Sequence, residues 1–267
     1  MIPAGRNRLR RLAWPAAQPR GTVLLIHGFA EHAGRYGEVA QALNRIGLDV
    51  FAVELPGHGK SEGRRGDVSS FDDFLLALDG LLESLSPEAR ERPRVVVAHS
   101  MGGLIALRWL ETRGLRPDCM VLSAPWLGTS PLLSPVTRLL KWLMGLVAPG
   151  VPVRRPIQAA GLTRDPEMQA RRVADPLVVN RISARLVGEV ESVQPLALAA
   201  GPGVPTLVIS PGADPVTDQS VVLEWCARFR DEVELIELPG ARHEPFNDLG
   251  RAETIERMCN WIESHLP

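Results

Sequence analysis

Lysine and aromatic residues are scarce in this chain of 267 residues, and neither sign of charge dominates. Lysine occurs twice and tyrosine once, and aromatic side chains make up 5% of the sequence. The formal net charge is −1, so no surplus of positive charge predicts a nucleic-acid partner. Nearly all basic residues are arginine, which we interpret as a compositional bias rather than as a phosphate-binding surface.

Cysteines and long apolar runs are also few. Cys119, Cys226 and Cys259 are an odd number and show no metal-type spacing, which favours reduced, buried thiols. The basic segment 1–11 is not followed by the apolar stretch of a signal peptide. The most apolar region, 132–147, contains proline, glycine and charged residues and is too interrupted to span a bilayer. Together these absences predict a cytoplasmic protein.

Short apolar runs alternate with longer segments of helical periodicity along the chain. The runs are rich in β-branched residues and nearly continuous in hydrophobicity, as in strands that are covered on both faces. The expected strands are Thr22–Ile26, Asp49–Val53, Arg94–Ala98, Cys119–Ser123, Thr206–Ser210 and Val233–Leu238, with Arg8–Trp14 as an antiparallel edge strand. The expected helices are Tyr36–Ile46, Phe71–Ser84, Gly102–Arg113, Gln219–Arg228 and Ala252–His265. This alternation predicts an α/β fold with a mostly parallel central sheet flanked by helices.

One region departs from the alternation. Between 125 and 202 the sequence has many prolines, several arginines, no convincing strand and two candidate helices, Pro135–Val147 and Pro176–Leu198. We interpret 125–202 as a helical cap inserted between core strands and folded over the carboxyl ends of the sheet, where open α/β sheets bind ligands. The core then consists of 1–124 and 203–267.

The strongest chemical signal is the segment RVVVAHSMGG at 94–103, where a strand pattern ends at His99 and a helical pattern begins. Ser100 would lie on the sharp strand-to-helix turn that presents a nucleophile above a sheet. The residues two positions before and after it must be small so that strand and helix can approach. Gly102 meets this need, and Ala98 stands where glycine is usual. The alternative is that Ser100 only caps the helix, since serine is a favoured N-cap residue.

A serine hydroxyl needs a base to become a nucleophile, and His243 is the candidate. Downstream of Ser100 the only histidines are His243 and His265, and His265 lies on the last expected helix. His243 follows the last expected strand, which places it above the same edge of the sheet as Ser100. The acid is expected after the preceding strand, where Asp214 and Asp218 both qualify. We favour Asp214, which is nearer to the strand end, because Asp218 is well explained as a helix N-cap.

Two backbone amides are candidates for an oxyanion hole, which holds the negative oxygen of a tetrahedral intermediate. One belongs to Met101, directly after the candidate nucleophile. The other belongs to Phe29, in the loop after the first central strand, where Gly28 allows a tight turn. The side chains of Phe29 and Met101 matter less for this role than their amides.

The remaining polar residues predict no further chemistry. Four histidines are expected to make structural hydrogen bonds rather than to catalyse: His27, His32 (to Glu31), His58 and His99. No set of His, Cys, Asp or Glu has metal-type spacing, and no glycine-rich phosphate loop is present. We therefore expect no metal.

Three motifs, in this order, resemble the monoacylglycerol lipase and lysophospholipase-type α/β hydrolases. They are HGFAEHAGRY at 27–36, PGHGKSEG at 56–63 and HSMGG at 99–103. Asp214 and His243 stand where that family has its acid and base, and the segment DPL at 175–177 matches its cap. The resemblance implies the α/β-hydrolase fold and a Ser–His–Asp acyl-enzyme mechanism without a cofactor. The chain departs from the family at Ala98 and at its N-terminus, which lacks the usual opening hairpin.

The resemblance also implies a lipid ester substrate, from which the enzyme releases a fatty acid and glycerol. The apolar residues of the expected cap would then line an acyl tunnel or make transient contact with a membrane or micelle. The candidate substrate contacts are Leu132, Leu133, Leu139 and Leu143. An alternative of equal weight is that these residues pack the cap onto the sheet, because apolar stripes on helices usually belong to the hydrophobic core.

Other functions stay open. With the same three residues, the substrate could be a lysophospholipid, a short-chain ester, an acyl thioester or a peptide amide. Dehalogenation and epoxide opening normally use a carboxylate nucleophile, so Ser100 argues against them. A non-catalytic ligand-binding homologue is the alternative from another class, and an intact serine, acid and histidine argue against it. The sequence predicts neither the chain-length preference nor the oligomeric state.

Overall fold

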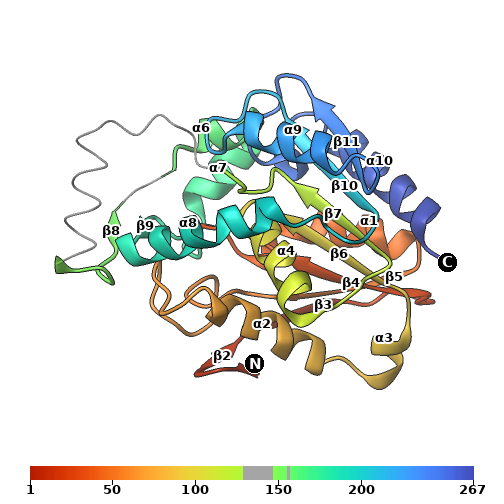
Figure 1. Cartoon of the computed structure of the whole chain (residues 1–267), viewed down its shortest axis with the longest axis horizontal. Helices are drawn as coiled ribbons and strands as arrows, with labels where there is room; N and C mark the ends of the chain where they lie inside the picture. The colour runs from red at the N-terminus through yellow and green to blue at the C-terminus, as the bar shows by residue number, and fades with distance from the viewer. Residues whose placement is uncertain (129–146, 155–156) are drawn as a thin grey trace.

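The centre of the molecule is a seven-stranded sheet. It is seen in a computed structural model that describes residues 1–128, 147–154 and 157–267. Its strands are β3 (Arg11–Trp14), β4 (Gly21–Ile26), β5 (Leu48–Val53), β6 (Arg94–His99), β7 (Cys119–Ser123), β10 (Thr206–Pro211) and β11 (Val233–Leu238). Their spatial order is β11-β10-β7-β6-β4-β5-β3 (Figure 1). All neighbours pair in parallel except β3, which runs antiparallel to β5 at one edge.

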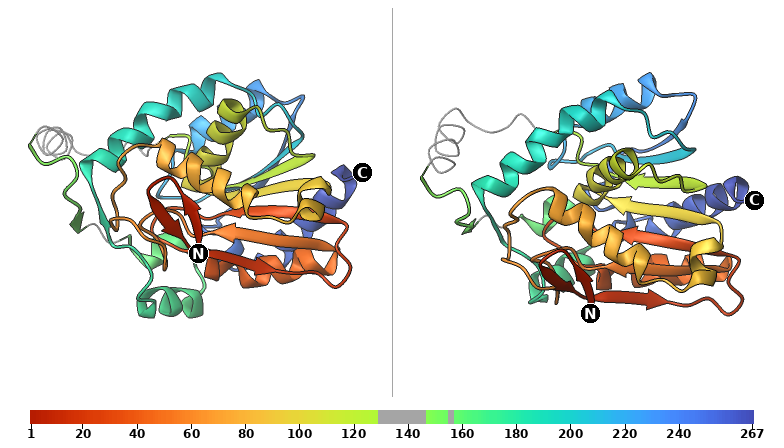
Figure 2. Two further views of the ribbon diagram at one scale, coloured as in Figure 1. Left: turned by 90° about the horizontal axis from the view of Figure 1, so that it is seen from below. Right: turned by 60° about the horizontal axis from the view of Figure 1, so that its bottom comes forward.

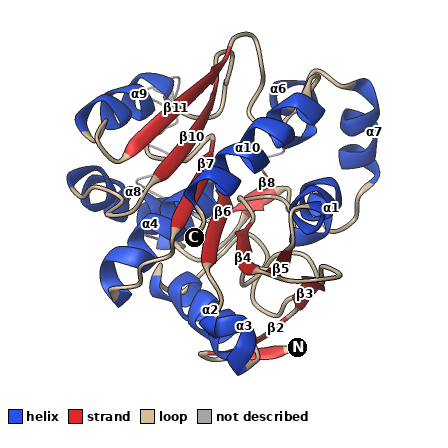
Figure 3. Cartoon of the chain, turned by 90° about the vertical axis from the view of Figure 1, so that its right-hand side faces the viewer, coloured by secondary structure: helices blue, strands red, loops and turns tan. Residues whose placement is uncertain are grey.

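Helices cover both faces of this sheet (Figure 3). One layer consists of α1 (Gly37–Arg45) and α10 (Arg251–His265). The opposite layer contains α2 (Asp72–Glu83), α4 (Met101–Arg113), α8 (Ala184–Ala199) and α9 (Gln219–Arg228), with the short α3 (Pro87–Glu91) beside them. Successive strand residues serve opposite layers: Val23 and Leu25 of β4 join the α1–α10 core, and Leu24 and Ile26 join the other. The inner strands β4, β5, β6, β7 and β10 are therefore buried on both sides.

The expected α/β architecture is confirmed. Each of the six expected parallel strands and five expected core helices begins and ends within one residue of the observed element. The agreement has a physical reason, because an inner strand covered on both faces is apolar at nearly every position and so stands out in the sequence.

The N-terminal segment differs from the expectation. It forms an opening hairpin of β1 (Ile2–Ala4) and β2 (Asn7–Leu9), which packs beside α2 (Figure 2). The turn is made at Gly5, whose φ of 54° suits a residue without a Cβ. The expected antiparallel edge strand Arg8–Trp14 is confirmed only over its second part, because β2 ends at Leu9 and the edge strand β3 begins at Arg11.

The segment between β7 and β10 also corrects two expectations. It contains a pair of two-residue strands, β8 (Val153–Arg154) and β9 (Arg181–Ile182), where no strand was expected. Two unexpected helices, α6 (Ala159–Leu162) and α7 (Pro166–Ala174), precede β9. The helix expected from Pro176 begins only at Ala184, after Ser183 caps it by accepting from the Leu186 amide.

Part of this segment lies outside the described residues. The expected helix Pro135–Val147 falls there except for its last residue. So do all four candidate substrate contacts: Leu132, Leu133, Leu139 and Leu143.

The described part of the segment contacts loops that follow several sheet strands. The Leu162 carbonyl accepts from the Glu244 amide in the loop after β11. Ser183 Oγ donates to Asp67 Oδ1, which lies between β5 and α2. These contacts place the described part of the segment at the edge of the sheet where the parallel strands end. Within the three described ranges, no helix has both the length and the apolar character needed to cross a membrane.

Candidate active site

Ser100 lies on the turn between β6 and α4. Its backbone has φ 51° and ψ −118°, a conformation that residues with a side chain rarely adopt. The turn is held by the Ser100 amide, which donates to the Ser123 carbonyl of β7 at 2.9 Å. The Ser100 side chain makes no capping bond to α4. Instead, its Oγ lies 2.9 Å from Nε2 of His243.

Gly102 allows this turn to form close to the sheet. A Cβ at this position would lie 2.4 Å from the Ile26 carbonyl oxygen and 2.6 Å from that of His27. Both oxygens belong to backbone at the end of β4, so neither can move aside easily. The close packing of α4 against β4 therefore explains why residue 102 must be small.

His243 lies in the loop after β11 and is 4% exposed. Its Nδ1 is 2.7 Å from Oδ2 of Asp214. An ionised carboxylate only accepts hydrogen bonds, so the proton sits on Nδ1. Nε2 of the neutral ring is then free to accept the proton of Ser100, which is the tautomer that a general base requires.

Asp214 accepts hydrogen bonds from neighbouring residues as well as from the His243 imidazole. Its Oδ2 also accepts from Thr217 Oγ1 at 2.6 Å, and its Oδ1 accepts from the Val216 amide at 2.7 Å. Burial by itself would raise the pKa of Asp214, but His243 and these hydrogen bonds outweigh burial and lower it. Asp218, the alternative acid, caps α9 by accepting from the Ser220 amide.

The two candidate oxyanion amides flank the serine turn. Met101 is the first residue of α4, and Phe29 follows Gly28 in the loop after β4. The Gly28 amide is fixed by Glu31 Oε1, to which it donates at 2.6 Å. Within the described residues, neither the Phe29 nor the Met101 amide donates to another group of the protein.

Three buried histidines near this site have structural hydrogen bonds. His27 Nε2 accepts from the Leu55 amide, and the Nδ1 atoms of His58 and His99 lie 2.9 and 3.1 Å from the carbonyls of Pro56 and Ser123. Burial lowers the pKa of His58 to about 3 and that of His99 to about 4. These rings are therefore neutral near pH 7.

His32 has a different partner from the one expected. Its Nε2 lies 2.7 Å from Oδ2 of Asp175, at the end of α7, rather than against Glu31. The expectation was wrong because it considered only the neighbouring residue, whereas α7 brings a distant carboxylate to the ring. In the described part of the chain, no three His, Cys, Asp or Glu side chains are placed to hold a metal ion.

Most of the chain matches one known protein family. Residues 17–250 match the family described as serine aminopeptidase, S33. The chain belongs to this family. The match confirms the α/β-hydrolase fold that the three sequence motifs implied.

Relatives of this S33-family hydrolase include a monoacylglycerol lipase of Mycolicibacterium smegmatis, which is 34% identical over 94% of this chain and 91% of that protein. Phospholipase YtpA of Bacillus subtilis is 27% identical over 95% of this chain and 99% of that protein. Among solved structures, the monoacylglycerol lipase of Paleococcus ferrophilus superposes with a TM-score of 0.86 at 31% identity, covering 97% of this chain and 99% of that one. These similarities confirm the resemblance to monoacylglycerol lipases.

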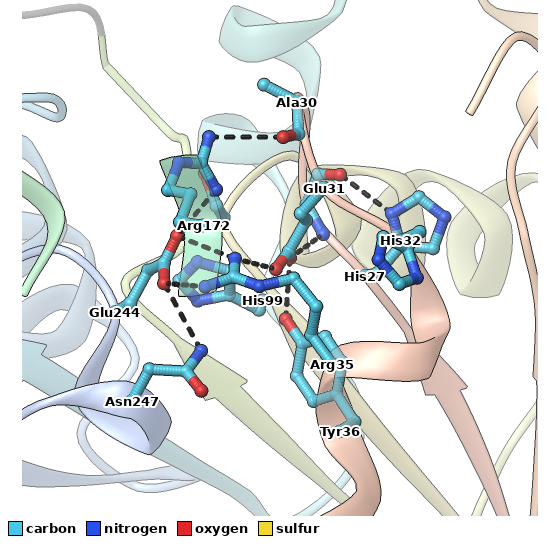
Figure 4. Close-up of polar contacts among 12 residues, drawn as sticks. His27, Ala30, Glu31, His32, Arg35, Tyr36, His99, Arg172, Glu244 and Asn247 are labelled. Atoms are coloured by element: carbon cyan, nitrogen blue, oxygen red, sulfur yellow. Dashed lines mark hydrogen bonds and ion pairs between the residues drawn. The ribbon is translucent and has the colours of Figure 1, made fainter. Parts of the chain in front are cut away.

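A buried ionic network behind the site of this S33-family hydrolase was not predicted from the sequence. It consists of two glutamates and two arginines that contact one another: Glu31, Arg35, Arg172 and Glu244 (Figure 4). Glu244 directly follows His243, and Glu31 lies two residues after Phe29. Glu31 and Arg35 lie within the motif at 27–36, so the motif could have indicated these two residues. Arg172 had no such signal, because α7 was not expected.

Proposed function

We propose that this protein hydrolyses carboxylic esters that carry a single acyl chain, with a monoacylglycerol as the main substrate. The observation that carries the proposal is the pair of hydrogen bonds from Ser100 through His243 to Asp214. The similarity to monoacylglycerol lipases over nearly the whole chain supports the choice of substrate.

In the first half of the reaction, Ser100 is acylated. Its Oγ attacks the ester carbonyl while His243 Nε2 takes the hydroxyl proton. The amides of Phe29 and Met101 bind the oxyanion of the tetrahedral intermediate. The intermediate collapses, the bond to glycerol breaks, and His243 gives its proton to the departing alcohol oxygen. Asp214 holds the imidazole in the required tautomer and stabilises the imidazolium without taking a proton itself.

In the second half, water releases the acyl chain. His243 Nε2 takes a proton from the water as the water oxygen attacks the acyl-enzyme carbonyl. The same two amides, of Phe29 and Met101, bind the second oxyanion. The fatty acid leaves as Ser100 regains its proton from His243. The cycle balances with one water consumed and uses no cofactor.

We also propose that 125–202 acts as a cap over this centre and that its surface touches lipid. The contacts of the described part with loops at the carboxyl edge of the sheet support the position of the cap. The exposed side chains Val147, Val151 and Val153 support a transient contact with a membrane or micelle. Three free, buried cysteines fit a reducing compartment and support a location in the cytoplasm.

The test compares wild-type protein and Ser100→Ala on 1-oleoylglycerol, with release of oleate as the measurement. Wild type should turn this ester over, and the variant should lose roughly four to six orders of magnitude in kcat. Ser192→Ala is the matched control, because Ser192 is an exposed serine on α8 whose Oγ donates to the Glu189 carbonyl of the same helix. It should keep full activity.

The substrate class needs a panel in the same assay. Lysophosphatidylcholine, p-nitrophenyl butyrate, an acyl-CoA thioester and a peptide amide represent the competing activities. The proposal expects the highest kcat/KM for the monoacylglycerol. A higher value for the lysophospholipid would favour the activity named in phospholipase YtpA, and near-normal hydrolysis by Ser100→Ala would refute the mechanism.

A further inference from the structure

Arg172 reaches from α7 into the buried region behind the candidate active site. Its side chain is 5% exposed, although it belongs to a helix whose other arginine, Arg171, is 63% exposed. Its Nη2 donates to the carbonyl oxygen of Ala30 at 3.1 Å, and its Nη1 donates to Glu244 Oε1 at 3.1 Å (Figure 4). One planar guanidinium therefore joins two loops that come from different strands.

Each of these two contacts lies directly beside a proposed catalytic group. Ala30 follows Phe29, whose amide is proposed for the oxyanion hole, and Glu244 follows His243. Ala30 has a φ of 61°, an unfavourable conformation for a residue with a Cβ, so its loop needs external contacts to keep this shape. The Arg172 hydrogen bond to the Ala30 carbonyl supplies one of them.

The contacts of Arg172 close a ring. Arg35 donates to both carboxylate oxygens of Glu244, at 2.9 and 2.7 Å, and to Glu31 Oε2 at 3.1 Å. Glu31 is covalently linked to Ala30, and its other oxygen accepts from the Gly28 amide. The loop that carries Phe29 is thus fixed on both sides, by Glu31 at Gly28 and by Arg172 at Ala30. The ring has two positive and two negative charges, which balance in a largely buried region.

The paired charges make the ring rigid. Burial by itself would raise the pKa of Glu244, but Arg35 and Arg172 outweigh burial and lower it, so this carboxylate stays ionised. Guanidinium donors have a fixed fork geometry, and each bond therefore defines an angle as well as a distance. A lysine has no such fork and cannot hold both partners in the same geometry.

We propose that Arg172 is a positioning residue that sets the Phe29 loop and the His243 loop relative to one another. The helix α7 then completes the active centre. This inference rests on the proposed ester hydrolysis, and it predicts that removal of Arg172 lowers the rate of chemistry rather than the affinity for substrate.

The test is Arg172→Met, which keeps most of the side-chain volume and removes every donor. Kinetics with p-nitrophenyl acetate, a small soluble ester, separate positioning from binding of a long acyl chain. We expect kcat to fall roughly 10- to 100-fold, as for other small misplacements of catalytic groups, with KM changed less than about twofold. The rate of labelling by a fluorophosphonate should fall by the same factor, because that reaction needs the same serine and oxyanion geometry.

Two further variants make the result decisive. Arg171→Met is the matched control, because Arg171 forms an ion pair with Glu167 on the surface of the same helix, and it should behave as wild type. Arg172→Lys keeps the charge without the fork and should fall between wild type and Arg172→Met in kcat. It serves as the measured variant if Arg172→Met does not fold.

Several outcomes would overturn the inference. They are a folded Arg172→Met with wild-type kcat, a change in KM alone, full activity in Arg172→Lys, or a loss of kcat that disappears when rates are expressed per folded molecule. A wild-type protein without any esterase activity would refute the proposed function itself, which is a separate result.

Discussion

Gly102 sets the distance between α4 and the sheet, and so the position of Ser100. Alanine at this position would drive its Cβ into backbone oxygens of Ile26 and His27. We expect Gly102→Ala to lower the free energy of unfolding by about 3 kcal/mol or more, because backbone must shift to relieve the overlap. Ester hydrolysis should fall with it. Urea denaturation and the esterase assay measure the two effects.

A second glycine provides the control for this prediction. Gly188 lies on the exposed side of α8, and a Cβ there meets no atom of the described residues outside this helix within 4 Å. Gly188→Ala should therefore raise the free energy of unfolding by about 0.5–1 kcal/mol, the usual helix preference for alanine. If both variants had the same stability as wild type, close packing at Gly102 would not be what fixes the turn.

At the scale of single residues, the sequence predicted side chains that the fold brings together when each of them directly follows a strand. Ser100, Asp214 and His243 each follow a recognisable strand, and parallel strands end at one edge of the sheet. Arg172 could not be predicted in this way. An arginine in a polar helix normally faces water, and only the tertiary fold shows that this one is buried against Glu244.

At the scale of elements, α7 is attached to the core by a titratable contact. His32 donates from Nε2 to Asp175, and its Nδ1 lies 3.6 Å from Glu54 Oε1. Burial by itself would lower the pKa of His32, but the hydrogen bonds and charges of Glu54 and Asp175 outweigh burial and raise it above 6.5. Protonated His32 therefore stabilises the fold below pH 6.5, and this contribution is lost as pH rises through the higher folded-state pKa.

The variant His32→Gln tests this contact. Glutamine has no charge to lose, so its difference in unfolding free energy from wild type should be largest at pH 6 and shrink as pH rises toward 9. Urea titrations across that range measure the difference, and the comparison cancels contributions from other groups such as His27. A difference that stays constant with pH would show that protonation of His32 does not hold α7.

The elements that the sequence did not predict are either very short or largely polar. The strands β1 and β2 have three residues each and α6 has four, too few for a periodic pattern to appear. The helix α7 is largely polar, yet its start was marked by Asp165 and Pro166, a capping residue followed by proline at the first helical position. The long strands and helices of 1–124 and 203–267 had neither problem and were predicted closely.

At the scale of the whole molecule, the three proposed catalytic side chains lie far apart in the sequence. Asp214 follows Ser100 by 114 residues, and His243 follows Asp214 by 29. The segment between β7 and β10 accounts for most of the first interval. Its buried contacts through Arg172, Asp175 and Ser183 connect it to the core at several points. The core and the described part of the segment therefore form one connected unit.

The most direct test of the account is the site and rate of covalent modification by a fluorophosphonate, followed by mass spectrometry of the intact protein and of its peptides. Activation of Ser100 by His243 predicts one adduct per chain, located on Ser100, and a labelling rate that falls by several orders of magnitude in His243→Ala. An adduct on another residue, no adduct at all, or wild-type labelling of the His243→Ala variant would contradict it.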